Sequence, residues 1–214
     1  MVWAILSFLI SLTGPSLAPR YRLSPFETSL VEEINKMRQD PQGYASLLEE
    51  QRQYYHGDVL AFPGAPRIRT AEGAEALDEA IRDLRSTEPL PQLTVSGGLC
   101  HAARDHVEDQ GKRGLVGHAG SDSSDATVRA SRYSPNPAGV GENIIYGATD
   151  LTAWIMLRFL ADHGIPDRGH RRNFLDPKFE FVGIACGPHA AYDGMCVLDF
   201  ARNYAESPSV AAED

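Results

Sequence analysis

The sequence predicts an α+β fold, arranged as an α–β–α sandwich with a small central antiparallel sheet. Apolar residues recur at three- and four-residue steps along several segments, which is the spacing of one helix face. Two segments near the C-terminus, residues 179–187 and 195–204, are instead rich in Val, Ile, Phe and Tyr and are typical of strands. Short antiparallel strands between helices indicate the α+β class.

The N-terminal half is predicted to be mostly helical. Ser24-Pro25 supplies a cap residue and a proline for the first turn of a helix. The apolar face of that helix consists of Leu30, Val31, Ile34 and Met37. Asp40-Pro41 interrupts the pattern, and a second short helix follows with Tyr44, Leu47 and Leu48. Residues 57–69 contain Gly and Pro breaks and are predicted to form a loop, and residues 71–85 a further helix.

The C-terminal half is predicted to alternate helices with strands. Ser96 caps a helix that runs to about Gln110, and His106 on its inner face is expected to be a hydrogen-bonded core residue. Helices over residues 125–133 and 152–162 flank a strand over residues 143–146. The tail, residues 205–214, is small, polar and acidic and is expected to fray.

Composition and charge describe an ordinary globular chain with an acidic balance. Of the 214 residues, 43% are hydrophobic and 23% charged, so a core can form. The net charge of −9 argues against binding to nucleic acid or anionic lipid, which both reward positive charge. Histidines and carboxylates can still attract a cation locally.

The first 18 residues predict a secretory signal peptide. An apolar run of about 12 residues ends at Ser16-Leu17-Ala18, a spacing that signal peptidase accepts. The run is shorter than the roughly 20 residues that span a bilayer, so no stable membrane span is expected. No Lys or Arg precedes it and Pro19 follows the cut, which leaves a packed N-terminal strand or helix as the alternative. The mature domain is then expected over residues 19–210, secreted or periplasmic.

Two of the three cysteines are placed for a disulfide. Cys186 and Cys196 flank a turn-rich stretch between the two predicted strands, and a hairpin would bring their Cα atoms to about 5.5 Å. An oxidising compartment favours that bridge. Cys100 is expected to be a buried, inert hydrophobe; a nucleophile paired with His101 is the alternative, although adjacent helix residues do not face each other.

Three glycine-flanked polar fragments stand out: Gly117-His118-Ala119-Gly120-Ser121-Asp122, Gly141-Glu142-Asn143-Ile144 and Gly169-His170-Arg171-Arg172-Asn173. Each places a histidine or a carboxylate beside glycine, where the backbone can turn and expose the side chain. Together they predict a polar site built from loops around a packed core.

The ordered set resembles the CAP family (cysteine-rich secretory proteins, antigen 5 and pathogenesis-related 1 proteins), also called SCP-like domains. The resemblance covers about residues 26–204, apart from an insertion at about residues 50–90 that is partly helical. It implies a central cleft with two histidines and two acidic residues, of which His118, Glu142 and His170 match three. At the fourth position, three residues after Trp154, this chain has Leu157 instead of Glu. Asp162 shares an apolar helical stripe with Leu151 and Ile155 and can replace that Glu; the alternative is that Asp162 faces solvent.

The histidines and carboxylates suggest a divalent cation, with zinc favoured over other metals. Imidazole is a common zinc ligand, and Glu142 can be a further ligand or can orient a histidine from behind. The alternative for both histidines is structural hydrogen bonding. Asn143 and Asn173 are expected to satisfy backbone groups, and Arg171 and Arg172 to form salt bridges.

The resemblance implies a non-enzymatic binding or interaction module, with a lipid, a sterol or an extracellular protein as partner. The alternative is a metal-dependent hydrolase of peptides or esters that uses the same cleft, with Glu142 as general base. The sequence contains no Gly-x-Ser-x-Gly elbow and no His-Glu-x-x-His helix, so it supports a cleft better than a reaction.

Overall fold

The computed structural model describes residues 21–147 and 151–207. The predicted signal segment, residues 1–18, and most of the predicted acidic tail lie outside this part. The helices are α1 (Pro25–Gln39), α2 (Pro41–Gln51), the 3-10 turn η1 (Arg52–Tyr54), α3 (Glu75–Ser86), α4 (Gly97–Arg113), α5 (Ala126–Ser131), α6 (Thr152–Ala161) and α7 (Gly169–Leu175). The strands are β1 (Tyr55–His56), β2 (Val59–Leu60), β3 (Ile68–Arg69), β4 (Thr94–Val95), β5 (Gly141–Tyr146), β6 (Phe181–His189) and β7 (Asp193–Ala201).

The main sheet has four strands in the order β4-β6-β7-β5. β6 and β7 form the predicted hairpin, in register from Phe181 opposite Ala201 to His189 opposite Asp193. β5 runs antiparallel to β7 and forms one edge of the sheet, while β4 pairs in parallel with β6 at the other edge. Among the described residues, polar groups on β5 therefore lie at an edge of the sheet that no further strand covers.

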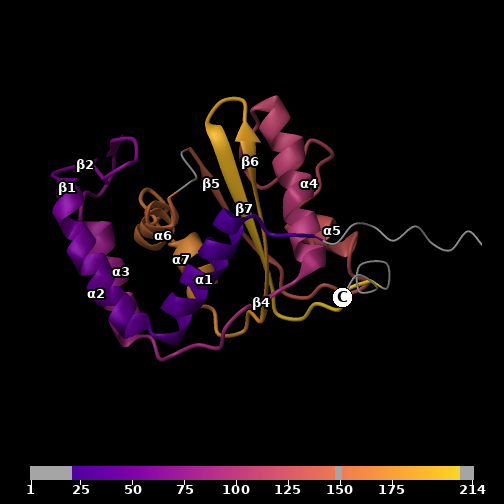
Figure 1. Cartoon of the computed structure of the whole chain (residues 1–214), viewed down its shortest axis with the longest axis horizontal. Coiled ribbons are helices and arrows are strands. Elements are labelled where there is room, and N and C mark those ends of the chain that lie inside the picture. Colours follow the sequence, from indigo (N-terminus) through magenta and orange to yellow (C-terminus); the bar gives the residue numbers. More distant parts are fainter. Residues whose placement is uncertain (1–20, 148–150, 208–214) are drawn as a thin grey trace, which may run out of the picture.

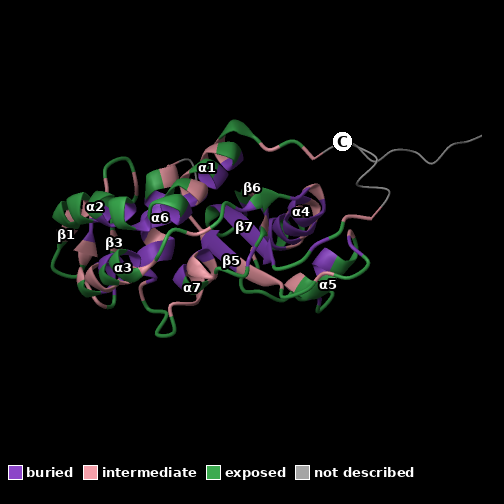
Figure 2. Ribbon diagram, turned by 90° about the horizontal axis from the view of Figure 1, so that it is seen from below, coloured by how far each residue is buried: buried purple, intermediate pink, exposed green. Residues whose placement is uncertain are grey.

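Helices cover both faces of this sheet, as predicted (Figures 1 and 2). α4 and α5 lie on one face, and α1, α6 and α7 lie on the other, with α2 and α3 stacked outside them. The alternation of side chains along β6 and β7 explains this arrangement. Ile184 and Leu198 join the large core with α1 and α6, whereas Ala185 and Val197 pack with Ala103 of α4. The chain is thus an α+β sandwich of three layers.

Local signals in the sequence set several helix ends. Ser24 and Glu27 form a reciprocal capping box at the start of α1. α4 ends at Gly114, whose φ of 64° suits a residue without a Cβ atom. α6 ends at Asp162, which also has a left-handed φ, of 54°. Asp tolerates this conformation better than most residues, so the chain can turn sharply where α6 ends.

The structure differs from the sequence-based expectation in several elements. The Gly169–Asn173 fragment, expected in a loop, begins α7, a helix too short to show periodicity. The loop predicted over residues 57–69 contains β2 and β3, which with β1 form a small sheet of two-residue strands. α3 begins at Glu75, after a turn, and α4 continues to Arg113. Length explains most of these differences, because elements of two to seven residues carry little pattern.

The predictions for the disulfide and for the buried Cys100 are confirmed. Cys186 and Cys196 are directly opposite in the β6–β7 register and form a disulfide, with their Cα atoms 4.1 Å apart. Cys100 is fully buried on α4 and unbridged. Burial raises the pKa of its thiol to about 12, so it stays protonated and unreactive near neutral pH.

The backbone of α4 approaches the sheet very closely at Gly183 of β6. A Cβ atom there would lie 2.2 Å from the backbone carbon of Leu99, and backbone cannot swing aside. We expect Gly183→Ala to lower the free energy of unfolding by about 3 kcal/mol, as overpacking does. Urea denaturation measures this. Gly169→Ala is the matched control, because its nearest neighbouring atoms lie 3.7 Å away; equal effects of the two substitutions would contradict the tight packing of α4.

Candidate functional site

The candidate site is organised by two consecutive residues of the edge strand β5. Consecutive strand residues point to opposite faces of a sheet. Glu142 shares its face with Ile144, which packs against α4, and Asn143 points to the face covered by α6 and α7. His118 lies on the face covered by α4, and His170 lies on the face covered by α6 and α7. The two histidine fragments therefore flank the same edge from its two sides.

On the α4 face, His118 pairs with Glu142. The His118 side chain is 61% exposed, while that of Glu142 is 3% exposed, and Nδ1 of the imidazole lies 2.8 Å from Oε1 of the carboxylate. The other carboxylate oxygen of Glu142 accepts a hydrogen bond from Nη2 of Arg129, whose side chain is fully buried. Both oxygens of Glu142 are thus engaged, and the Nε2 atom of His118 remains at the surface.

The contacts among these three residues shift the pKa values of both Glu142 and His118. Burial by itself raises the pKa of Glu142, but the hydrogen bond from His118 and the charge of Arg129 outweigh it and lower the pKa. The hydrogen bond with Glu142 raises the pKa of His118 above its ordinary value, against an opposing effect of burial. The carboxylate therefore stays ionised and orients the ring.

A second carboxyl group lies buried below Glu142. Asp199 of β7 is directly opposite Glu142 in the strand register and is fully buried. Neither of its oxygens has a hydrogen-bond partner among the residues that the structure describes. Burial and the negative charge of Glu142 raise the pKa of Asp199 well above the usual range. The predicted core role of His106 is confirmed, because it is buried and its Nε2 atom lies 3.0 Å from the carbonyl oxygen of Gly117.

On the opposite face, His170 pairs with Asp162. Asp162 is only 2% exposed, and Oδ1 lies 2.6 Å from Nδ1 of His170. Its other oxygen, Oδ2, accepts the backbone N–H of His170 at 2.9 Å. The Phe159 ring packs beside the imidazole. Asp162 therefore faces the site instead of solvent, and it holds both the ring and the first turn of α7.

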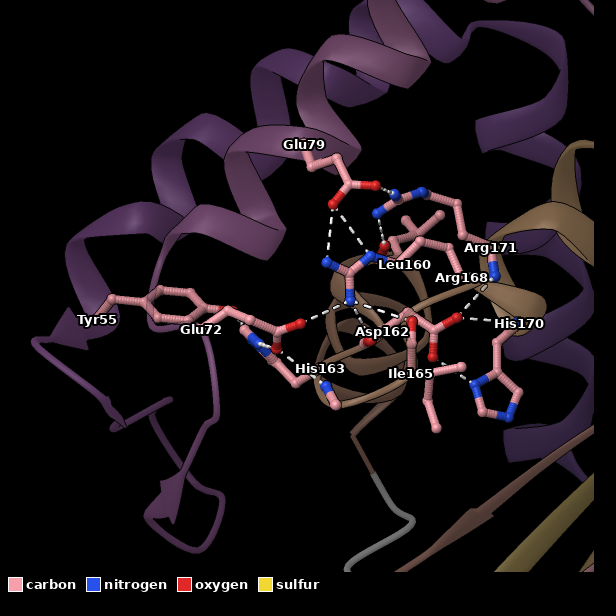
Figure 3. A network of polar contacts seen from close by, with 11 residues as sticks. Tyr55, Glu72, Glu79, Leu160, Asp162, His163, Ile165, Arg168, His170 and Arg171 are labelled. Atoms are coloured by element: carbon pink, nitrogen blue, oxygen red, sulfur yellow. Dashed lines mark hydrogen bonds and ion pairs between the residues drawn. The ribbon is translucent and has the colours of Figure 1, made fainter.

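A network of arginines and carboxylates fixes the loop between Asp162 and His170 (Figure 3). Glu72 accepts hydrogen bonds from the backbone N–H of Gly164 and from Arg168, both at 2.9 Å. Glu79 of α3 pairs with Arg168 and with the buried Arg171. Glu72 belongs to the predicted insertion, so a segment far away in sequence holds the loop that presents His170.

Two asparagines connect α7 to the edge strand β5. Asn143 donates a hydrogen bond from Nδ2 to the backbone oxygen of His170 at 3.1 Å. Asn173 of α7 donates to the Asn143 side-chain oxygen at 2.8 Å. These bonds place the start of α7 against β5 beside Glu142. The two asparagines were expected to form hydrogen bonds with backbone groups, and Asn143 does so with His170.

Each pair consists of an imidazole with a carboxylate behind it. Zinc-bound histidines commonly hydrogen-bond a carboxylate through the second ring nitrogen, which is the arrangement of both pairs. Within the described ranges, no group of three or more His, Cys, Asp or Glu side chains is arranged to hold a metal. The structure brings His118 together with Glu142 and His170 with Asp162, as two separate pairs on opposite faces of the sheet.

The site contains no evident nucleophile. In residues 21–147 and 151–207, no serine, threonine or cysteine side chain is hydrogen-bonded to either imidazole. Ser121 instead donates to Asp109, and Cys100 lies in the core. The arrangement can bind and polarise a ligand through imidazole nitrogen, but it lacks the paired nucleophile and base of covalent hydrolases.

Sequence reasoning missed the partners beneath the histidines. Arg129, Asp199 and Glu72 come from α5, β7 and the turn before α3, and no local pattern marks them as belonging to one site. Two signals were available: Asp125, which caps the helix α5 that carries Arg129, and an acidic residue within an otherwise apolar strand, Asp199. Leu157, which replaces the usual Glu, is fully buried in the core.

Comparison with known proteins identifies the family. The sequence model described as "CAP: Cysteine-rich secretory protein family" matches residues 79–200, more than half of the chain. The chain belongs to the CAP family. Residues 1–78, which include Glu72, lie outside this match. No curated protein sequence matches the chain.

Two solved structures are similar at low sequence identity. One is an extracellular protein from Bacillus anthracis that contains an SCP domain, with 19% identity and a TM-score of 0.44; the similarity covers 60% of this chain and 37% of that protein. The other is an outer surface protein from Borrelia burgdorferi, with 14% identity and a TM-score of 0.45, covering 52% and 78% respectively. The chain thus corresponds to about a third of the length of the Bacillus protein.

Replacing Glu142 tests the electrostatics of the first pair. We expect Glu142→Gln to lower the pKa of His118 toward the ordinary histidine value of about 6.5, because the charged acceptor is removed. NMR titration of the His118 ring proton measures this, with His118→Ala providing the assignment. An unchanged titration midpoint would show that Glu142 does not orient His118 in solution.

The buried carboxyl group of Asp199 is expected to make the free energy of unfolding depend on pH in an unusual way. Folding raises the pKa of Asp199, so the protonated carboxyl group contributes fully to the free energy of unfolding below the unfolded-state pKa of about 3.9. That contribution is lost as pH rises through the folded-state pKa of Asp199. Asp199→Asn removes this loss, so the variant should gain stability relative to the wild type as pH rises above about 4. Urea denaturation at several pH values checks this; parallel curves for the two proteins would refute it.

Proposed function

We propose that the protein is an exported, non-enzymatic binding module that holds its ligand at the two carboxylate-oriented histidines. The observation that carries this proposal is the pairing of each imidazole with a buried carboxylate through Nδ1, which leaves Nε2 available. A lipid, a sterol or an extracellular protein is the partner class that we propose, with a divalent cation contributing at the histidines.

Export is supported by two features of the chain. The disulfide Cys186–Cys196 requires an oxidising compartment to persist. The apolar N-terminal segment has the length and the small-residue ending of a cleavable signal, and we propose that residues 19–210 form the mature protein. In the described part of the chain, the helices are too short or too polar to traverse a bilayer.

A binding role fits the site better than hydrolysis. The bound cation would supply Lewis acidity, yet both carboxylates are already engaged by His118, Arg129 and His170. A general base needs a free oxygen within reach of the attacking water. Glu142 is therefore suited to orient His118 and to keep it basic.

Zinc titration by calorimetry tests the proposal. We expect binding at about pH 7.5 that weakens strongly at about pH 5.5, because imidazole must be deprotonated to bind a metal. His118→Ala and His170→Ala should each reduce the affinity at least about tenfold, as loss of a ligand does, and Asp162→Ala should reduce it by about 10- to 100-fold through loss of orientation.

Two outcomes would overturn the proposal. Zinc affinity that is unchanged in both histidine variants would show that the histidines form no common site. Peptidase or esterase activity that survives purification and disappears in both variants would favour the hydrolase. Removal of Arg172, an exposed residue paired with Asp167, is the matched control and should leave zinc binding unchanged.

A further inference from the structure

In the part of the chain that the structure describes, no strand covers the outer edge of β5. The amide of Gly147 donates to the carbonyl oxygen of Gly194 in β7 at 3.0 Å, which sets the alternation of the ladder. In an antiparallel pair every second residue bonds to the neighbouring strand, and the residues between point their backbone groups away. Glu142, Ile144 and Tyr146 therefore direct their N–H and C=O groups to the open edge.

Side chains from two helices occupy the ends of this edge and leave its middle unpaired. Arg158 of α6 donates from Nη1 to the carbonyl oxygen of Tyr146 at 2.8 Å. Asn173 of α7 makes a longer contact, 3.4 Å, from Nδ2 to the carbonyl oxygen of Glu142. Between them, the N–H and C=O of Ile144 have no hydrogen-bond partner among the described residues, although Ile144 is only 8% exposed. Shielded backbone groups are rarely left unpaired, so this position is suited to a partner.

The two carboxylate-oriented histidines lie on either side of this edge. His118 lies on the face covered by α4 and His170 on the other face, and Nδ1 of each ring contacts its carboxylate. A cavity of about 510 Å³ opens along the face of His170. Its apolar lining consists of Ile68, Ile144, Ile145, Phe159 and Ile165. An extended chain beside β5 would therefore lie between the two imidazoles, with an apolar cavity for alternate side chains.

We propose that β5 accepts an extended peptide segment of a partner protein as a fifth, antiparallel strand of the main sheet, centred on Ile144. Strand addition is a recurring mode of peptide recognition, in which main-chain hydrogen bonds give affinity and pockets for alternate side chains give specificity. The inference deepens the proposed function and rests on it, because it takes an extracellular protein as the partner class.

The pairing geometry specifies what the peptide must contain. Its central residue exchanges two hydrogen bonds with Ile144, so this residue needs an N–H and cannot be proline. The two neighbours of the central residue lie opposite Asn143 and Ile145 and point to the face of the cavity, where apolar side chains fit. Amides two positions from the centre are dispensable, because the carbonyl oxygens at both ends of the edge already accept side-chain donors. The net charge of −9 favours basic residues at the peptide ends.

NMR titration of the full protein with a five-residue probe, acetyl-Lys-Val-Thr-Val-Lys-amide, tests the inference. We expect saturable binding with a dissociation constant below about 1 mM. Methylation of the backbone nitrogen of the central Thr should weaken binding at least about tenfold, because it removes the donor to the carbonyl oxygen of Ile144. Methylation of the backbone nitrogen of either Lys is the matched control and should change the affinity less than about twofold.

Hydrogen exchange in the same samples locates the pairing. The probe should slow the exchange of the Ile144 and Tyr146 amides at least about tenfold, because both become bonded to the added strand. The amide of Ile145 already bonds to β7, so it is the internal control and should change less.

Substitution by proline removes the central donor of the edge. Ile144→Pro deletes an N–H that makes no bond to β7, and proline is tolerated at such edge positions. It should reduce the affinity for the probe at least about tenfold. Val95→Pro is the matched control at the opposite edge of the sheet, where Thr94 and Ser96 donate to β6 and the amide between them points away. It should leave probe binding unchanged. The methylated probes and hydrogen exchange test the inference without any variant if Ile144→Pro does not fold.

The outcomes separate this inference from the proposed function. Absence of saturable probe binding at about 1 mM, equal affinity for the probe and its Thr-methylated form, or unchanged exchange at Ile144 overturns the inference. A dimer of the free protein that Ile144→Pro abolishes shows that the edge pairs with a second copy, which also overturns it. Probe binding that is lost in Ile144→Pro while zinc binding persists supports both proposals. Probe binding with protection of Ile144 in a protein that binds no zinc supports strand addition and contradicts the metal role of the histidines.

Discussion

Each histidine of the site depends on a buried carboxylate, and both oxygens of each carboxylate accept hydrogen bonds from neighbouring groups. Glu142 is held by Arg129 and His118, and Asp162 by the ring and the backbone N–H of His170. A buried carboxylate without such partners would take up a proton, as the raised pKa of Asp199 illustrates. The difference between Glu142 and Asp199, which face each other across two strands, is therefore a difference in partners.

The second constraint is the set of ion pairs from the segment that was predicted to be an insertion. Glu72 and Glu79 neutralise Arg168 and Arg171, so the loop that carries His170 is bound to α3 as well as to α6. The same segment closes one side of the cavity through Ile68. This segment thus links the position of a site histidine to the shape of the adjacent pocket, whereas the exposed His118 is held by Glu142 and Arg129.

The sequence predicted the fold class, the hairpin disulfide and the residues of both histidine pairs. Their signals are local: strands rich in Val, Ile, Phe and Tyr, glycine-flanked histidines, and an acid on the apolar stripe of α6. It could not predict that Asp162 would pair with His170 and Glu142 with His118, because that pairing depends on which face of β5 each residue occupies. The roles of Arg129 and Glu72 could not be predicted for a related reason, since their partners lie in other elements and only the tertiary structure brings them together.

The tautomers of His118 and His170 test the account most directly. Hydrogen bonds from Nδ1 to Glu142 and Asp162 require the proton of the neutral ring to reside on Nδ1, leaving Nε2 as the free acceptor and ligand. Long-range ¹H–¹⁵N spectra of the imidazoles, recorded at about pH 8.5 where histidine is neutral, distinguish the two forms. The account predicts the Nδ1–H tautomer for both residues. Protonated Nε2 atoms, or rapid averaging between tautomers, would contradict it.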